Sequence, residues 1–176
     1  MKTLVDGDCH STVTDALPIG GFGAVADGHL QLYALRSMDI PQSVRDLIAQ
    51  GPLGHLVTLD ADGTPHVTLV WADFDGDELV FATFPDQHKL ESIRRDSRVV
   101  VSFQAHHNPG PGLHPYVVIS GRGRILEGGA LEWMDHLAHA YLGPGEKFPM
   151  RDGPPGFVVR VAVDRIYGVG PWGHAF

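Results

Sequence analysis

The sequence predicts a mainly β fold, in which six antiparallel strands form a closed or split β-barrel with helices between them. Six short apolar segments alternate with turn residues, a pattern that is typical of antiparallel barrels. The first three segments are joined by tight turns, whereas parallel strands need crossover connections of a dozen or more residues. No Gly-x-Gly-x-x-Gly motif opens a helix, so the signature of a doubly wound nucleotide-binding sheet is missing.

The strands are recognised by their apolar content and by the turns that separate them. Asp62-Gly63 and Asp75-Gly76 have the residue types of tight hairpin turns, and each lies between two apolar runs. The six strands are expected, in chain order, at 53–59, 65–72, 78–83, 98–104, 116–126 and 157–163, the last continuing through Ile166 and Tyr167.

Three helices are expected to accompany the strands. The first has Asp39 as its predicted N-cap and Pro41 in its first turn, and Gly51-Pro52 ends it. The second is expected over 86–95 and the third over 129–142. In the third helix five apolar residues share one face, namely Leu131, Met134, Leu137, Ala138 and Tyr141.

The chain divides at Met38 into two parts of different character. Residues 1–37 show no periodicity, and the glycine-rich stretch 20–23 is typical of a loop. We expect an irregular N-terminal extension that is poorly ordered or draped on the surface, or that results from an upstream start codon. Residues 38–176 are expected to form a single domain with its own core.

Composition limits the function classes. The formal net charge is −8, which argues against non-specific nucleic-acid binding. No apolar run is long enough to span a membrane, and Cys9 alone cannot form an internal disulfide. Because Asp6 and Asp8 near the N-terminus are unlike the basic start of a secretory signal, the cytoplasm is the expected compartment.

The segment 81–103 contains a candidate phosphate site. An apolar strand ends at Thr83, and Lys89 lies at the start of the following helix. A hydroxyl group, a fixed positive charge and the free N–H groups of a helix start together suit a phosphate group. The alternative is that Lys89 lies on a solvated helix face.

Several segments together resemble one known superfamily. Residues 64–71, 79–83, 87–99 and 116–124, in this order and spacing, are similar to the pyridoxamine 5'-phosphate oxidase-like split-barrel superfamily, which binds flavins or the deazaflavin F420. The ending 163–172 resembles the F420-dependent branch. The resemblance covers about residues 38–173 and implies a six-stranded FMN-binding split barrel that forms a homodimer, with its cofactor sites at the subunit interface.

The resemblance also implies a set of cofactor-binding residues. The second strand would lie along the ring, Thr83 and Lys89 would hold the phosphate, and Trp71 and Trp172 would be walls of the site. His66 and His88 would lie near the cofactor, and either is a candidate proton donor. The full predicted set is His66, Val67, Thr68, Leu69, Val70, Trp71, Ala82, Thr83, His88, Lys89 and Trp172.

The predicted phosphate site departs from the family pattern in one respect. Family members commonly carry arginine directly before the lysine or two residues before it, where this chain has His88 and Gln87. Five arginines lie nearby, namely Arg94, Arg95, Arg98, Arg122 and Arg124. They either compensate by forming a basic strip for the polyglutamate tail of F420 or are solvated on the surface.

The leading hypothesis is an F420-dependent oxidoreductase that transfers a hydride from the reduced deazaflavin to a small unsaturated organic substrate. The alternatives are an FMN-dependent oxidase or reductase of the same fold, and a non-catalytic protein that binds a flavin, F420 or haem. No catalytic residue is assigned, since the cofactor carries the chemistry. The eleven histidines show no His-Glu-x-x-His motif or zinc spacing, so no metal site is expected.

Overall fold

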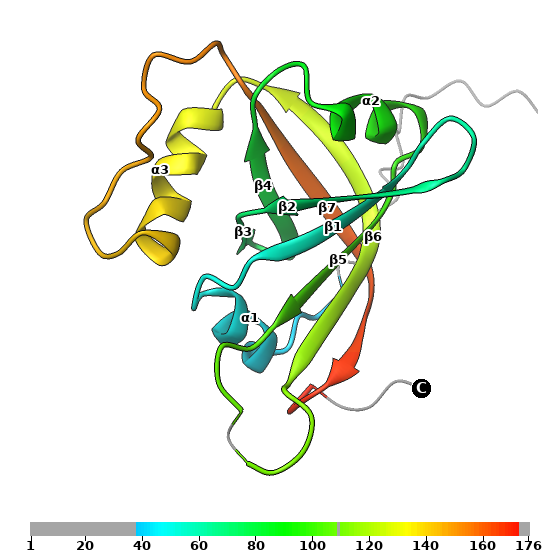
Figure 1. Cartoon of the computed structure of the whole chain (residues 1–176), viewed down its shortest axis with the longest axis vertical. Coiled ribbons are helices and arrows are strands. Elements are labelled where there is room, and N and C mark those ends of the chain that lie inside the picture. Colours follow the sequence, from blue (N-terminus) through cyan, green and yellow to red (C-terminus); the bar gives the residue numbers. More distant parts are fainter. Residues whose placement is uncertain (1–37, 109, 173–176) are drawn as a thin grey trace, which may run out of the picture. The chain divides into compact units, whose positions relative to one another are not determined.

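The computed structural model describes residues 38–108 and 110–172, so the predicted extension 1–37 lies outside the described residues. This part of the chain contains three helices and seven strands (Figure 1). In chain order they are α1 (Gln42–Ile48), β1 (Gly54–Leu59), β2 (Pro65–Val70), β3 (Ala72–Asp75), β4 (Glu78–Thr83), α2 (His88–Arg95), β5 (Arg98–Gln104), β6 (Tyr116–Glu127), α3 (Ala130–Tyr141) and β7 (Phe157–Val169).

The strands form one antiparallel sheet in the order β2-β1-β5-β6-β7-β4-β3. Its two edge strands, β2 and β3, are separated in the chain by Trp71 alone. The chain therefore leaves the sheet at one edge and enters it again at the other, and the two edges meet at Trp71. This arrangement is a split barrel, so the predicted fold class is confirmed.

The sheet has seven strands instead of the expected six, because the run expected as one strand at 65–72 changes partner at Trp71. Before this residue the backbone pairs with β1, and after it the backbone pairs with β4. Because the two pairings place the backbone at opposite edges of the sheet, the run is divided into two strands.

The prediction that Asp39 is the N-cap of α1 is wrong. Pro41 takes this position with φ −55° and ψ 137°, and its carbonyl oxygen accepts hydrogen bonds from the amides of Val44 (2.9 Å) and Arg45 (3.3 Å). The extended backbone of Pro41 delays the first helical residue to Gln42. The carboxylate of Asp39 is therefore two residues before the cap, and no side chain caps this helix.

The centre of the barrel is apolar and closely packed. The helix α1 packs against the strands with Val44 and Ile48, both of which are fully buried. Large side chains buried between the strands include Leu56, Leu79, Phe81, Phe103 and Ile119. A Cβ at Gly121 would collide with the carbonyl oxygen of Ala162, so glycine allows the close approach of β6 and β7 where their register shifts.

The helix α2 contributes Leu90 and Ile93 to this core, whereas no residue of α3 belongs to it in the part of the chain that the structure describes. The helix α2 packs on β1 and β6 through Leu90 and Ile93, and α3 lies beside β4 (Figure 1). Within the described residues, no helix has the length and hydropathy needed to cross a membrane.

Candidate cofactor site

A cavity of about 260 Å³ opens where the end of β2, the end of β4 and the start of α2 come together. The helix α3 and the loop after it cover one side. The lining residues are Leu69, Val70, Trp71, Ala82, Thr83, Phe84, Gln87, Lys89, Met134, Leu137 and Phe148. Six of them belong to the predicted cofactor-binding set: Leu69, Val70, Trp71, Ala82, Thr83 and Lys89.

Lys89 contributes a buried positive charge to this cavity. Its side chain is at the second position of α2, and the residue is only 8% exposed. The nearest polar partner is an amide, because Nζ donates a hydrogen bond of 3.4 Å to Oε1 of Gln87. No carboxylate oxygen of the described residues lies within 4 Å of Nζ. Burial lowers the pKa of Lys89 below its ordinary value of 10.5, since the charged form has lost water without gaining a counter-ion.

Two further features make this end of the cavity suitable for an anion. Thr83 ends β4, and it is 6% exposed, so its hydroxyl is held close to the cavity. The helix α2 begins here, and no side chain caps its first turn. Because the start of a helix carries a partial positive charge, its field adds to that of Lys89.

Aromatic rings form the opposite wall of the cavity. Trp71 is stacked on Tyr141 with 4.9 Å between ring centroids and 12° between planes, and Phe148 meets Trp71 edge-on at 5.9 Å. The Tyr141 hydroxyl donates to the carbonyl oxygen of Pro52 (2.8 Å) and accepts from the amide of Ala72 (3.1 Å). Burial raises the pKa of Tyr141 to about 12. Tyr141 therefore stays neutral and holds Trp71 in place.

The strand β2 presents two faces. His66, Thr68 and Val70 are on the more buried face, whereas Val67 and Leu69 are each 56% exposed. Only the end of the strand reaches the cavity, so His66, Val67 and Thr68 are not among its lining residues. The hydroxyl oxygen of Thr68 is buried without a hydrogen-bond partner in the described residues.

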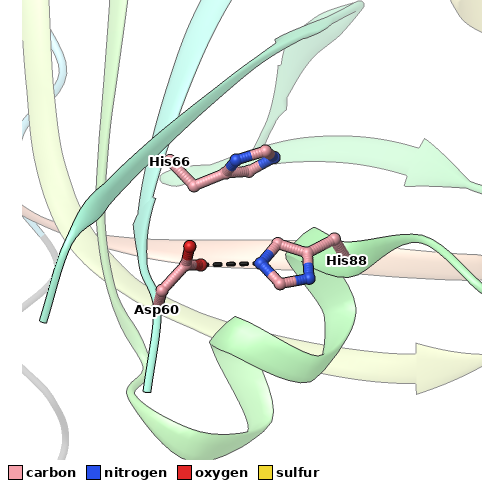
Figure 2. Close-up of side chains that lie close together, drawn as sticks. All are labelled: Asp60, His66 and His88. Atoms are coloured by element: carbon pink, nitrogen blue, oxygen red, sulfur yellow. Dashed lines mark hydrogen bonds and ion pairs between the residues drawn. The ribbon is translucent and has the colours of Figure 1, made fainter. Parts of the chain in front are cut away.

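The remaining two predicted residues, His88 and Trp172, are not among the lining residues of this cavity either. His66 and His88 contact each other edge-on with 4.8 Å between ring centroids, and Nε2 of His88 lies 2.7 Å from Oδ1 of Asp60 (Figure 2). Trp172 lines a different cavity of about 370 Å³ beside α1. Its indole N–H donates to the carbonyl oxygen of Tyr116 at 3.1 Å.

The arginines that could have formed a basic strip have partners of their own. Arg95 donates to the carbonyl oxygen of Leu59 at 2.7 Å, and the guanidinium of Arg94 lies 5.3 Å from the ring centroid of Phe157. The other three make ion pairs: Arg98 with Asp96, Arg122 with Asp164, and Arg124 with Glu78. None of the five is among the residues that line the Lys89 cavity.

Sequence reasoning missed the side of the cavity that α3 provides. Met134 and Leu137 were expected on the apolar face of this helix, but the pattern does not show that the face covers a cavity. Phe148 lies in a loop without a readable motif. Asp60 was also missed, because it is 28 residues from His88 in the chain.

Comparison with known proteins agrees with this architecture. A family profile described as pyridoxamine 5'-phosphate oxidase matches residues 40–170. An F420 reductase structure is 25% identical with a TM-score of 0.61, and the match covers 72% of this chain and 98% of that one. A conserved hypothetical protein from Mycobacterium tuberculosis is 23% identical with a TM-score of 0.60, covering 74% and 84% of the two chains.

A haem-binding protein from Mycobacterium smegmatis shares the same fold at 21% identity, with a TM-score of 0.55 and coverage of 78% of this chain and 57% of that one. No curated protein matches the chain in sequence. The family profile spans most of the chain, and its span holds every strand of the split barrel and the cavity with Lys89. The chain therefore belongs to the pyridoxamine 5'-phosphate oxidase family.

Proposed function

We propose that the protein is an F420-dependent oxidoreductase that reduces a small unsaturated organic substrate. The observation that carries this proposal is the buried charge of Lys89, whose nearest polar partner is the side-chain amide of Gln87. An unpaired buried cation is unfavourable. A phosphate group in the cavity would supply the missing counter-ion, and the phosphate of a flavin or deazaflavin suits the family.

The residues present fit such a phosphate. Lys89 and Thr83 would hold it by charge-assisted hydrogen bonds, and the start of α2 would add its dipole. The cavity of about 260 Å³ is small compared with ligand pockets of about 300–1,000 Å³. It would therefore hold one end of the cofactor, and the ring would extend out of the cavity along β2.

When bound, reduced F420 supplies a hydride from C5 of its ring. The protein would fix the position of the ring and exclude water from the substrate. Trp71 is suited to this role because Tyr141 and Phe148 restrict its indole. No side chain of the described residues is assigned as an acid or base.

We propose further that the active form is a homodimer. Val67 and Leu69 expose apolar side chains on the outer face of β2. A third cavity, of about 350 Å³, lies over the outer face of β1, β5 and β6, and Val57 and Val100 contribute to its lining. Adjacent exposed apolar surface is typical of an interface. A second copy on this face would also complete a cofactor site that one chain forms only in part.

FMN is the second candidate cofactor. The similarity to an F420 reductase, together with the sequence ending at 163–172, favours F420. The observation that favours FMN is that the five arginines near the predicted tail path all have partners within the chain. A polyglutamate tail would have to compete for them, whereas FMN has no such tail.

Binding of both cofactors to the purified protein decides between these candidates. F420 and FMN are titrated separately, and binding is followed by the quenching of cofactor fluorescence. Stronger binding of F420, followed by oxidation of reduced F420 in the presence of α,β-unsaturated carbonyl compounds, supports the proposal. Tight binding of FMN without binding of F420 replaces it by the second candidate. Binding of neither rejects both.

A further inference from the structure

Three potential metal ligands meet outside the Lys89 cavity, where the turn between β1 and β2 lies against α2. Asp60 follows the last residue of β1, His66 is the second residue of β2, and His88 is the first residue of α2. Each residue offers one possible ligand atom, and the three ligand atoms all lie within 4.8 Å of one another. Figure 2 shows the carboxylate and the two imidazole rings grouped together from these separate elements.

The spacing of the ligand atoms is close to that of a metal centre. Oδ1 of Asp60 is 2.7 Å from Nε2 of His88, and the ligand atoms of the three residues all lie within 4.8 Å of one another. Ligand atoms bonded at about 2.1 Å to a tetrahedral ion are about 3.4 Å apart. Since this value lies between the 2.7 Å separation and the 4.8 Å limit, side-chain shifts of about 1 Å would form the site. His88 and Asp60 have partly exposed side chains (51% and 30%), so such shifts leave the core unchanged.

The backbone positions of the three residues are fixed by other contacts. The amide of Asp60 donates to the carbonyl oxygen of Thr64 at 2.9 Å, which closes the turn between β1 and β2. Arg95 ties α2 to the same hairpin through its 2.7 Å hydrogen bond to the carbonyl oxygen of Leu59. The Ser92 hydroxyl, on α2, donates to Oδ1 of Asp60 at 3.4 Å. Such outer contacts orient metal ligands and raise affinity.

We propose that Asp60, His66 and His88 form a binding site for a divalent transition-metal ion, with Zn²⁺ the best match. Two imidazole nitrogens and one carboxylate oxygen are a donor set that suits Zn²⁺ and is poor for Ca²⁺ or Mg²⁺. Three protein ligands leave a fourth position, which is accessible because His88 is half exposed. Water or an anionic group of a ligand would occupy this position. The proposal does not depend on the identity of the cofactor.

A second histidine–aspartate pair provides an internal comparison. Nε2 of His136 lies 3.0 Å from Oδ2 of Asp73, with side-chain exposures of 51% and 27%. The pair therefore resembles His88 and Asp60 in distance and burial. However, Trp133 packs on the His136 ring at 4.8 Å between centroids, and no third ligand joins this pair in the part of the chain that the structure describes. It should not bind a metal ion.

The test uses the untagged full chain, freed of metal by a chelator. Zn²⁺ affinity and stoichiometry are measured by competition with a chromophoric chelator, and Co²⁺ absorption reports the ligand set. The wild type is expected to bind one ion per chain at this site. His66→Ala and His88→Ala should each lower the affinity by more than about tenfold, since loss of an outer-shell contact alone typically costs 10- to 100-fold. The matched variant His136→Ala should bind as the wild type does.

Absence of Zn²⁺ binding by the wild type overturns the proposal, as does wild-type affinity in His66→Ala or in His88→Ala. If the histidine variants fail to fold by circular dichroism, Asp60→Asn decides. It keeps the size of the side chain and its place in the turn, and it removes the anionic ligand. A loss of more than about tenfold in this variant supports the site, and unchanged affinity rejects it.

Discussion

Replacing Lys89 by methionine removes the buried charge and keeps much of the apolar stem. The effect of the charge on cofactor binding can then be measured separately from its effect on the stability of the ligand-free protein. If Lys89 holds a phosphate, the variant loses a charge-assisted interaction of about 1.5–3 kcal/mol. Since 1.4 kcal/mol corresponds to a factor of ten, affinity for F420 or FMN should fall about 10- to 150-fold. Fluorescence titration measures this change. Lys147→Met is the matched control, because Lys147 is exposed and is not among the residues that line the cavity.

The ligand-free protein should respond to the same change in the opposite direction. Burial lowers the pKa of Lys89, so its charged form destabilises the folded state. Lys89→Met should therefore raise the free energy of unfolding by about 1 kcal/mol, which corresponds to about 2–4 °C in Tm for a chain of this size.

The pH dependence of this difference follows from linkage. Between the lowered pKa of the folded state and the ordinary value of 10.5, the unfolded chain binds more protons than the folded one, so wild-type stability rises with pH. The difference in free energy of unfolding between the wild type and Lys89→Met should therefore become smaller as the pH rises through this interval. Urea unfolding at neutral and alkaline pH measures it. Unchanged cofactor affinity, or a less stable ligand-free variant, would refute the role assigned to Lys89.

Three further changes test other parts of the structure. Tyr141→Phe removes the hydroxyl that bonds to the backbone of Pro52 and Ala72, and it should lower the free energy of unfolding by about 1–2 kcal/mol in urea titrations; a neutral effect would show that the Trp71 wall does not need it. Burial opposes ionisation of Glu78, yet hydrogen bonds from Arg124 and Arg160 lower its pKa below 4.5. The ionised carboxylate therefore stabilises the fold fully above the pKa of Glu78 in the unfolded chain, and this stabilisation is lost as the pH falls through the lower pKa of the folded state. Glu78→Gln should lower the free energy of unfolding by about 1 kcal/mol at neutral pH, and unfolding experiments in acid should show no difference from the wild type. Val67→Glu places a charge on the proposed dimer face and should convert the dimer to a folded monomer in sedimentation experiments; a dimer of unchanged affinity would locate the interface elsewhere.

Local sequence patterns were sufficient to predict most of the fold. Apolar runs and turn dipeptides located the strands, and α3 begins and ends within one residue of the expected helix. The break at Trp71 could not be predicted, because nothing in the run itself interrupts a strand. It arises from pairing with β1 on one side and with β4 on the other, which depends on residues that are distant in sequence.

The candidate site was predicted in part for a similar reason. Thr83 and Lys89 are close in sequence, so their meeting could be expected from one strand, one turn and one helix. The cover of the cavity by Met134 and Phe148 depends on how α3 packs beside β4. The approach of Asp60 to His66 and His88 depends on how α2 packs on β1. Both are tertiary contacts that a single sequence does not encode in a readable pattern.

The start of α2 explains how the two proposed sites, which differ in chemistry, lie so close together. Successive residues of a helix point about 100° apart. Lys89 therefore turns into the cavity and is buried, whereas His88 turns toward the hairpin and stays half exposed. A cation without a counter-ion suits an anionic ligand, and an imidazole beside a carboxylate and a second imidazole suits a metal ion. Because α2 packs on β1 and β6 through Leu90 and Ile93 and is tied to β1 by Arg95, both proposed sites depend on the position of this helix on the sheet.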